Sequence, residues 1–250
     1  MRLVAAAVAA GLLLTACSSG GDLDDPEAAS TTVARATVET TTSTTEAPLT
    51  GQPLIVVEQG VSSFPDPFDL TTTLGGYGVV LQNPNLDVMA TGVRVITRIL
   101  DPAGTELLVD NALLNAVMPN QRMALGRTLI EPIADPTQLV VTVEVTAWLK
   151  PAFPEGALIA EGVVTEPEEN GGAVTRFTVR STWPEPEDGV DVTAVYRAAD
   201  GRILGAESTT VADVPVRGAV PGQIRLLSPI PDLATTEVFV GRGIAAQTTG

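Results

Sequence analysis

The feature that most restricts the fold of this chain is the alternation of aliphatic residues with other residues in several short runs. In the clearest run, aliphatic residues occupy every second position and Thr142, Glu144 and Thr146 lie between them. The aliphatic positions are Leu139, Val141, Val143, Val145 and Ala147. A period of two places successive side chains on opposite faces of a strand, so the run predicts a strand with one buried face. No helical stripe persists over ten residues after position 51, and we therefore predict an all-β fold.

Turn residues separate such runs. In a second run, Val93, Val95 and Ile99 alternate with Arg94 and Arg98. The segment 101–104 follows it, with Asp first, Pro second and Gly fourth, which are the preferences of a type I turn. A later Asp-Gly pair at 200–201 suits a tight hairpin. Both segments therefore predict that the chain reverses between two antiparallel strands.

The chain resembles itself when it is shifted by 97 residues. The shift places Gly92-Val93 on Gly189-Val190, Val95 on Val192, Ile99 on Tyr196, Ala103-Gly104 on Asp200-Gly201, and Asp135 on Asp232. With one insertion, Pro119-Asn120-Gln121 meets Pro221-Gly222-Gln223. We predict two tandem immunoglobulin-like β-sandwich modules, at 51–150 and 151–246, each with about seven strands or fewer. Proline near Lys150–Pro154 interrupts strand pairing and marks the boundary as a short exposed hinge.

One segment of each half carries a resemblance to a known family. Residues 78–85 form a strand that ends in Gln82-Asn83, and residues 92–104 form a second strand and a glycine-containing turn. This order resembles the FxLYD-type extracytoplasmic β-sandwich module, and residues 177–179 and 190–201 repeat it. The sequence departs from the family at Leu100, where an aromatic residue is expected, and at Arg180-Ser181, which replace Gln82-Asn83. The resemblance implies a non-catalytic surface or adhesion-like module, and it brings no catalytic residues.

The first seventeen residues have the pattern of an export signal. Arg2 precedes the uncharged apolar stretch Leu3–Leu14, which at about 18 Å is too short for a hydrocarbon core of about 30 Å. The stretch ends in Leu14-Thr15-Ala16-Cys17, which resembles the lipobox of bacterial lipoproteins. That resemblance implies that residues 1–16 are a cleaved signal peptide and that the Cys17 sulfur carries a diacylglyceryl group. The alternative is an ordinary signal, cleaved near Ala16, with Cys17 as an incidental thiol.

Residues 17–50 have the composition of a disordered tether. They hold no aromatic residue, and nine threonines fall between positions 31 and 50. Such a segment cannot bury enough apolar surface to offset the entropy of ordering its backbone. A flexible chain of this length reaches about 30–35 Å, which would lift the modules off a membrane. Threonine-rich segments are also acceptors for O-glycosylation, so sugar attachment is an open alternative to a plain spacer.

Composition excludes several classes of function. The chain has no histidine, one cysteine and one lysine, so a His-ligated metal, a catalytic triad with histidine and a disulfide framework have no residues to build them. A formal charge of −16 argues against nucleic acid as a partner, because that partner needs a basic face. We predict no catalytic residues, no cofactor and no metal site.

Two acidic clusters are candidates for a metal site or a catalytic carboxylate pair. They consist of Glu166, Glu168 and Glu169, and of Glu185, Glu187 and Asp188. Calcium prefers such oxygen ligands, but Pro167 and Pro186 interrupt the clusters and neither has the ladder with a central glycine that wraps the ion. A carboxylate pair can also hydrolyse a glycosidic bond, yet nothing in the sequence fixes the separation that this chemistry requires. We interpret both clusters as solvated loops.

The remaining candidates favour structural roles. Lys150 is the one lysine that a Ser-Lys dyad could use, and its place beside Pro151 indicates a surface position. The aromatic residues Trp148, Phe153 and Trp183 suit a sugar-stacking platform, but their positions near the ends of the second module favour packing at the module junction. The arginines Arg94, Arg98, Arg122 and Arg127 alternate with apolar neighbours, as residues on an exposed sheet face do.

Together these patterns predict a lipid-anchored, extracytoplasmic, non-catalytic binding or adhesion-like protein of the bacterial envelope. Its expected location is the extracytoplasmic face of the cell membrane. Its expected partners are membrane lipid, through acylated Cys17, and an envelope protein or glycan. The alternative is an accessory scaffold subunit of a larger envelope complex. A carboxylate-dependent hydrolase is the third reading.

Overall fold

The computed structural model describes residues 48–242, except 67, 68, 70, 130, 131, 134, 153, 154, 170, 171 and 228. The predicted signal peptide, Cys17 and nearly all of the predicted tether lie outside these residues. The described residues contain strands and turns but no helix, which confirms the all-β prediction. Among them there is accordingly no helix that is long and apolar enough to cross a membrane.

The first half of the described chain folds into two antiparallel three-stranded sheets. Its strands are β1 (Ile55–Pro65), β2 (Thr73–Gln82), β3 (Met89–Leu100), β4 (Glu106–Val117), β5 (Arg122–Leu129) and β6 (Gln138–Leu149). One sheet has the strand order β1-β2-β5, and the other has the order β4-β3-β6. The alternating runs of the sequence become β3 and β6, which pair along their whole length. We refer to these six strands as the first module.

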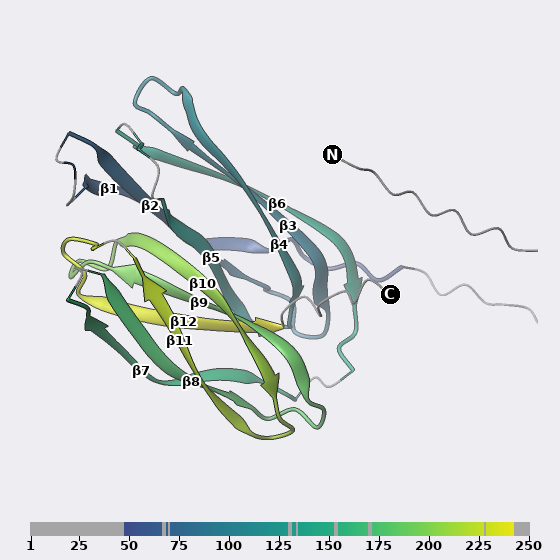
Figure 1. The fold of residues 1–250 in the computed structure, drawn as a ribbon. Helices are drawn as coiled ribbons and strands as arrows, with labels where there is room; N and C mark the ends of the chain where they lie inside the picture. The colour runs from purple at the N-terminus through teal and green to yellow at the C-terminus, as the bar shows by residue number, and fades with distance from the viewer. Residues whose placement is uncertain are drawn as a thin grey trace, which may run out of the picture. The chain divides into compact units, whose positions relative to one another are not determined.

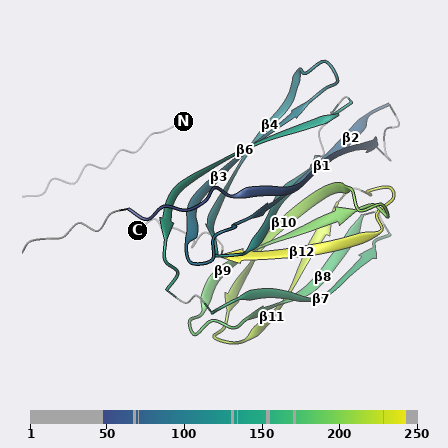
Figure 2. The same cartoon turned by 180° about the vertical axis from the view of Figure 1, so that it is seen from behind.

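The second half repeats the same topology. Its strands are β7 (Leu158–Pro167), β8 (Ala173–Ser181), β9 (Glu187–Arg197), β10 (Ile203–Val214), β11 (Ala219–Leu226) and β12 (Thr235–Arg242). The sheets have the orders β7-β8-β11 and β10-β9-β12, which match β1-β2-β5 and β4-β3-β6 (Figures 1 and 2). Each module therefore has six described strands in a sandwich of two sheets, and the strand count of an immunoglobulin-like fold is not confirmed.

The backbone of the two modules repeats at the predicted spacing of 97 residues. Gly104 N–H donates to the Asp101 carbonyl, and Gly201 N–H donates to the Ala198 carbonyl, both at 3.0 Å. These bonds close the predicted turns between β3 and β4 and between β9 and β10. Positive φ angles also recur 97 positions apart, at Asn120 (55°) and Arg217 (46°) and at Asp135 (45°) and Asp232 (63°).

One part of the sequence alignment is wrong. Pro119 and Asn120 lie in the turn between β4 and β5, whereas Pro221 and Gly222 lie inside β11. The structural counterpart of Asn120 is Arg217, which takes the same left-handed conformation in the turn before β11. Asparagine tolerates this conformation better than arginine does, so the conserved backbone geometry is not matched by similar residues.

Each module has its own apolar core, and a third cluster joins the two modules. The joining cluster contains Val80 and Ala124 of the first module and Val195, Ile203, Ala206 and Phe239 of the second. Its residues point away from the two module cores, so sheet β1-β2-β5 packs against sheet β10-β9-β12 (Figures 1 and 2). These two sheets are covered on both faces, which explains why eight consecutive residues of β2, Leu74–Leu81, are buried.

Glycine residues let the two inner sheets approach closely. A Cβ atom added to Gly76 would lie 2.5 Å from the Leu204 carbonyl oxygen, and one added to Gly78 would lie 2.9 Å from the Ile203 side chain. At Gly126 an added Cβ would lie 3.0 Å from the Ala206 side chain of the other sheet. Contacts with backbone atoms cannot be relieved by a side-chain rotation, so the sequence at these positions fixes the spacing of the sheets.

We predict that Gly76→Ala lowers the free energy of unfolding by about 2–3 kcal/mol, because the new methyl group would overlap the Leu204 carbonyl. Gly201→Ala is the matched control, since Gly201 has a φ of 86° but open space around an added Cβ. Backbone strain alone should cost that variant about 1 kcal/mol. Urea unfolding of both variants checks the prediction. Equal, small losses would contradict close sheet packing at Gly76.

Candidate functional site

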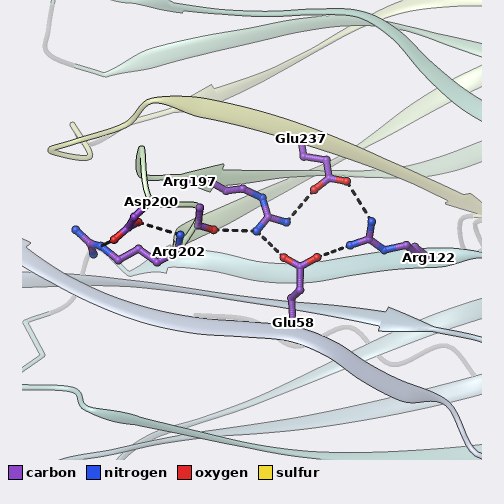
Figure 3. Close-up of polar contacts among 7 residues, drawn as sticks. Glu58, Arg122, Arg197, Asp200, Arg202 and Glu237 are labelled. Atoms are coloured by element: carbon purple, nitrogen blue, oxygen red, sulfur yellow. Dashed lines mark hydrogen bonds and ion pairs between the residues drawn. The ribbon is translucent and has the colours of Figure 1, made fainter.

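Four charged residues form a closed ring across the module interface (Figure 3). The Arg197 guanidinium contacts Glu58 at 2.6 Å and Glu237 at 2.8 Å. Arg122 also contacts both carboxylates, pairing with Glu58 and lying 3.6 Å from Glu237. Glu58 and Arg122 come from β1 and β5, and the other two come from β9 and β12. Each module therefore contributes one cation and one anion to the ring.

Arg197 is the central member of the ring, because its side chain is only 12% exposed. Burial alone would lower the pKa of Arg197, but hydrogen bonds to Glu237 and Glu58 outweigh burial and raise the pKa above its usual value. Arg122 is more exposed and lies 5.4 Å from the centre of the Phe239 ring. A buried guanidinium with two carboxylate partners makes charge-assisted bonds that hold the modules in one orientation.

Further hydrogen bonds cross the same interface. The Gln121 side chain donates to the Val240 carbonyl at 2.9 Å, and the Thr128 backbone N–H donates to Glu207 at 3.1 Å. The Ser62 hydroxyl donates to the Leu204 carbonyl. The three bonds lie just before β5, near its end and on β1, so they join the two modules at separate points of the interface.

A cleft of about 290 Å³ opens between the modules beside this interface. The first module supplies residues of β4 and β5, and the second supplies residues of β9 and β10. The side chains that matter for its chemistry are Tyr77, Asp110, Leu114, Met123, Leu125, Asp191, Thr193, Ser208 and Thr210. The cleft thus combines buried apolar residues of one module with carboxylate and hydroxyl groups of both.

Asp110 is well supplied with partners. The Tyr77 hydroxyl donates to its Oδ2 atom, Arg127 lies 3.1 Å from that atom, and the Asn111 backbone N–H donates to Oδ1 at 2.9 Å. Burial raises the pKa of Tyr77 well above its usual value, and the bond to Asp110 raises it further. Tyr77 therefore stays protonated and acts as a donor, and the Asp110 carboxylate forms an ion pair with Arg127.

Asp191 has far less support. In the described part of the chain no ion pair reaches its carboxylate, and the one side-chain hydrogen bond, from the Thr210 hydroxyl, is long at 3.4 Å. Burial raises the pKa of Asp191, and the Thr210 bond opposes this only in part. Nearby, burial also raises the pKa of Glu207, against the opposing effect of the Thr128 bonds and of Arg127. Asp191 is thus a half-buried carboxylate on the cleft wall without a cation.

A second pocket, of about 410 Å³, lies within the second module. It opens between β7 and β12, which are edge strands of different sheets, and Leu226, Ile230 and Leu233 line it. The Thr165 hydroxyl bonds to Thr236 at 2.8 Å across this gap. Among the described residues no charged side chain lines this pocket, so its residues give no indication of a specific ligand.

The structure corrects the solvated-loop prediction at one residue of the second acidic cluster. Glu187 is only 7% exposed, and its carboxylate pairs with Arg242 at 2.9 Å. The Arg242 guanidinium also lies 4.4 Å from the centre of the Trp183 ring, which holds both partners in place. Strand β9 begins at this position, so Glu187 enters the sheet instead of remaining in the loop. Glu185 and Asp188 are exposed as predicted.

The carboxylates of the first acidic cluster have separate surroundings. Glu166 pairs with Arg176, Glu168 lies 3.1 Å from Arg225, and Glu169 is exposed. Across the described residues, no three His, Cys, Asp or Glu side chains are grouped so that they could hold a metal ion. The structure therefore does not bring the carboxylates of this cluster together around a common point.

The aromatic candidates have separate positions. Trp183 is 2% exposed and shares a small pocket with Met118 and Pro119 of the first module, in agreement with packing at the junction. Trp148 instead packs against the core of its own module, so the junction prediction is wrong for it. The ring lies where β6 ends, and a Cβ added to Gly51 would be 2.5 Å from it. Phe153 and Cys17 lie outside the described residues.

The remaining charged candidates divide between the surface and the interface. Lys150 is exposed, as predicted. Arg94 and Arg98 lie on the outer face of β3 with exposed side chains, which confirms the prediction for them. Arg122 and Arg127 are exposed as well, but the prediction did not include their ion pairs: Arg122 joins the charged ring, and Arg127 pairs with Asp110 beside the cleft.

Sequence reasoning missed the cleft residues. Asp191 lies between Val190 and Val192, whose side chains enter the core, so alternation places Asp191 on the opposite face. This alternation by itself indicates that Asp191 is exposed to solvent. Only the packing of one module on the other converts this face into the wall of a cleft.

Comparison with known proteins gives little further information. No protein-family model matches the chain, and no curated protein matches it significantly. Two crystal structures of the β-glucuronidase of Parabacteroides merdae, one with glycerol in its active site, are 10% identical with a TM-score of 0.23. The matches cover 67% of this chain and only 28% and 27% of the enzyme chains. A TM-score this low carries no argument about the present chain.

We predict that Arg197→Met lowers the free energy of unfolding by about 1–3 kcal/mol, because Glu58 and Glu237 would lose a shared, nearly buried cation. The matched control is Arg180→Met, which breaks an exposed pair with Glu161 and should leave stability unchanged. Chemical unfolding at low and high salt is the measurement. A result in which both variants behave alike would show that the ring does not hold the modules together.

We predict that Asp191→Asn raises the free energy of unfolding at pH 7. The pKa of Asp191 is higher in the folded chain than its usual 3.8, so the folded state binds the proton more tightly than the unfolded state. As the pH rises above about 3.8, the unfolded chain releases this proton before the folded chain does. The contribution of Asp191 to the free energy of unfolding therefore falls as the pH rises. The exposed Asp188→Asn is the control in unfolding experiments at about pH 4 and pH 7. Destabilisation by Asp191→Asn at pH 7 would contradict the prediction.

Proposed function

We propose that the protein is a lipid-anchored, non-catalytic binding protein on the extracytoplasmic face of a bacterial cell membrane. In this proposal the two modules act as one body, and the partner enters the cleft between them. The observation that carries the proposal is that both modules line the cleft while the charged ring and the glycine contacts fix their orientation. A preorganised site loses little freedom when its partner binds, which favours binding as its function.

The lipid anchor is supported by the sequence pattern Leu14-Thr15-Ala16-Cys17 at the end of an apolar signal-like stretch. Two acyl chains suffice for stable attachment, at about 0.8 kcal/mol for each buried methylene group. Between Cys17 and β1 the chain supplies more than thirty residues, so a flexible spacer would let the cleft reach partners away from the membrane.

The hydrogen bonds and ion pairs of the cleft carboxylates favour a non-catalytic role. Asp110 is neutralised by Arg127 and bonded by the Tyr77 hydroxyl, so it is a poor nucleophile or base. Burial raises the pKa of Asp191, but hydrolysis of a glycosidic bond requires a second, free carboxylate to act with it, and the Glu207 carboxylate beside the cleft is bonded to the Thr128 backbone N–H.

An accessory scaffold subunit is the second candidate, and one observation favours it. Val109 and Leu113 are 41% and 56% exposed on β4, which is an edge strand of its sheet. Exposed apolar side chains on a free edge suit strand-to-strand docking of a partner protein.

We predict that Cys17→Ala moves the protein from the membrane fraction of cells to the soluble extracytoplasmic fraction, because the thioether that carries the lipid cannot form. Ser18→Ala is the matched control and should remain with the membrane. Fractionation followed by intact-mass measurement checks both variants. Membrane retention of Cys17→Ala with an unchanged mass would refute the anchor.

A site-specific photo-crosslinker tests the binding role in intact cells. Placed at Ser208, an exposed residue of the cleft, it should capture an envelope partner. Placed at Thr142, an exposed residue of β6 outside the cleft, it should capture none or a different one. Equal capture at the two positions would favour the scaffold function, and capture at Thr142 alone would overturn a role for the cleft.

A further inference from the structure

The cleft has an imbalance of charge. Asp110 and Asp191 line it, and Glu207 lies next to it with its carboxylate bonded to the Thr128 backbone. The one guanidinium beside these groups in the described structure is Arg127, which pairs with Asp110 and also lowers the pKa of Glu207. Arg127 forms an ion pair with Asp110 only, so in the described structure neither Glu207 nor Asp191 has an ion pair. Glu207 accepts a hydrogen bond from the Thr128 backbone N–H, whereas Asp191 has only the long bond from Thr210.

An unpaired, half-buried carboxylate is unfavourable for folding. Removing a charge from water without a partner costs free energy, and proteins normally pair such a group or hydrogen-bond it several times. Elsewhere in the same interface the chain does this well, since Arg197 contacts two carboxylates and Glu187 is paired with Arg242. The lack of support at Asp191 is therefore specific to the cleft, where a ligand can supply what the chain does not.

We infer that the cleft binds an organic cation, an ammonium or guanidinium group, through the carboxylate of Asp191. This inference deepens the proposed function and rests on the cleft being a binding site. Asp191 supplies the negative charge, and the hydroxyl oxygens of Thr193, Ser208 and Thr210 are acceptors for the remaining N–H groups of the cation.

The rest of the lining fits the same class of ligand. Leu114, Met123 and Leu125 are buried apolar residues of the first module that line the cleft. They offer a surface for the methylene stem that carries an ammonium or guanidinium group. An anion is disfavoured by the carboxylates, and the described residues provide no group of three carboxylates for a metal ion.

Isothermal titration calorimetry on the full chain tests the inference. The probes are Nα-acetyl-lysine amide and Nα-acetyl-arginine amide, with Nα-acetyl-norleucine amide as the neutral probe of similar shape. At least one cationic probe should bind with a dissociation constant of about 1 mM or tighter, and added salt should weaken binding. The neutral probe should bind at least about tenfold more weakly, because it lacks the charge that Asp191 attracts.

Two variants connect binding to the residue. Asp191→Asn should weaken binding of the cationic probe at least about tenfold, whereas Asp188→Asn, an exposed change in the same strand, should not. Their unfolding curves establish that both variants are folded. Equal affinity of Asp191→Asn and the native chain would overturn the inference, as would binding of the neutral probe alone or of calcium ions in place of the organic cations.

Two further probes distinguish the source of the cation. Tighter binding of a capped Gly-Lys-Gly peptide than of agmatine assigns the cation to a protein side chain, and the reverse order assigns it to a free amine. Either ranking of the two affinities supports a cation-binding site at Asp191. If no cation binds but the crosslinker at Ser208 still captures a partner, the ligand class is wrong and the binding role of the cleft stands.

Discussion

The close approach of two sheets from different modules is the constraint on which the rest of this structure depends. Sheet β1-β2-β5 lies against sheet β10-β9-β12, and an added methyl group at Gly76 would collide with the Leu204 carbonyl of the opposite sheet. Because of this spacing, Arg197 can reach Glu58 across the interface. The cleft follows from the same arrangement, since its walls are the edges of sheets that are held together a short distance away.

The interface uses charge in two opposite ways. In the ring, Arg197 is nearly buried and has two carboxylate partners, so its desolvation is compensated. In the cleft, Asp191 is half-buried and has one long hydrogen bond, so its desolvation is not compensated. The first arrangement favours stability and orientation, whereas the second gives up stability at a position open to a ligand, as functional sites commonly do.

The sequence predicts local structure well and the module interface poorly. Alternation identifies β6, and the turn at Asp101 and the 97-residue repeat hold in the backbone, because these depend on neighbouring residues and on one buried face. The same reasoning does not find the partners of Arg122, Glu187 and Asp191, because these partners come from strands far away in the sequence. The buried run of β2 likewise has no period of two, since a second module covers its outer face.

The duplicated modules do not meet through equivalent surfaces. The first module contributes its β1-β2-β5 sheet, but the second contributes β10-β9-β12, the counterpart of β4-β3-β6. Such head-to-tail contacts can extend into open filaments when the exposed sheet of the first module resembles the equivalent sheet of the second module, which is buried in the interface. Here the exposed counterpart carries Arg98 where the buried face has Val195, and Arg94 pairs with Glu144 beside it. Stacking another copy on that end would strip water from these charges, so the charges on the outer β3 surface work against polymerisation of the pair.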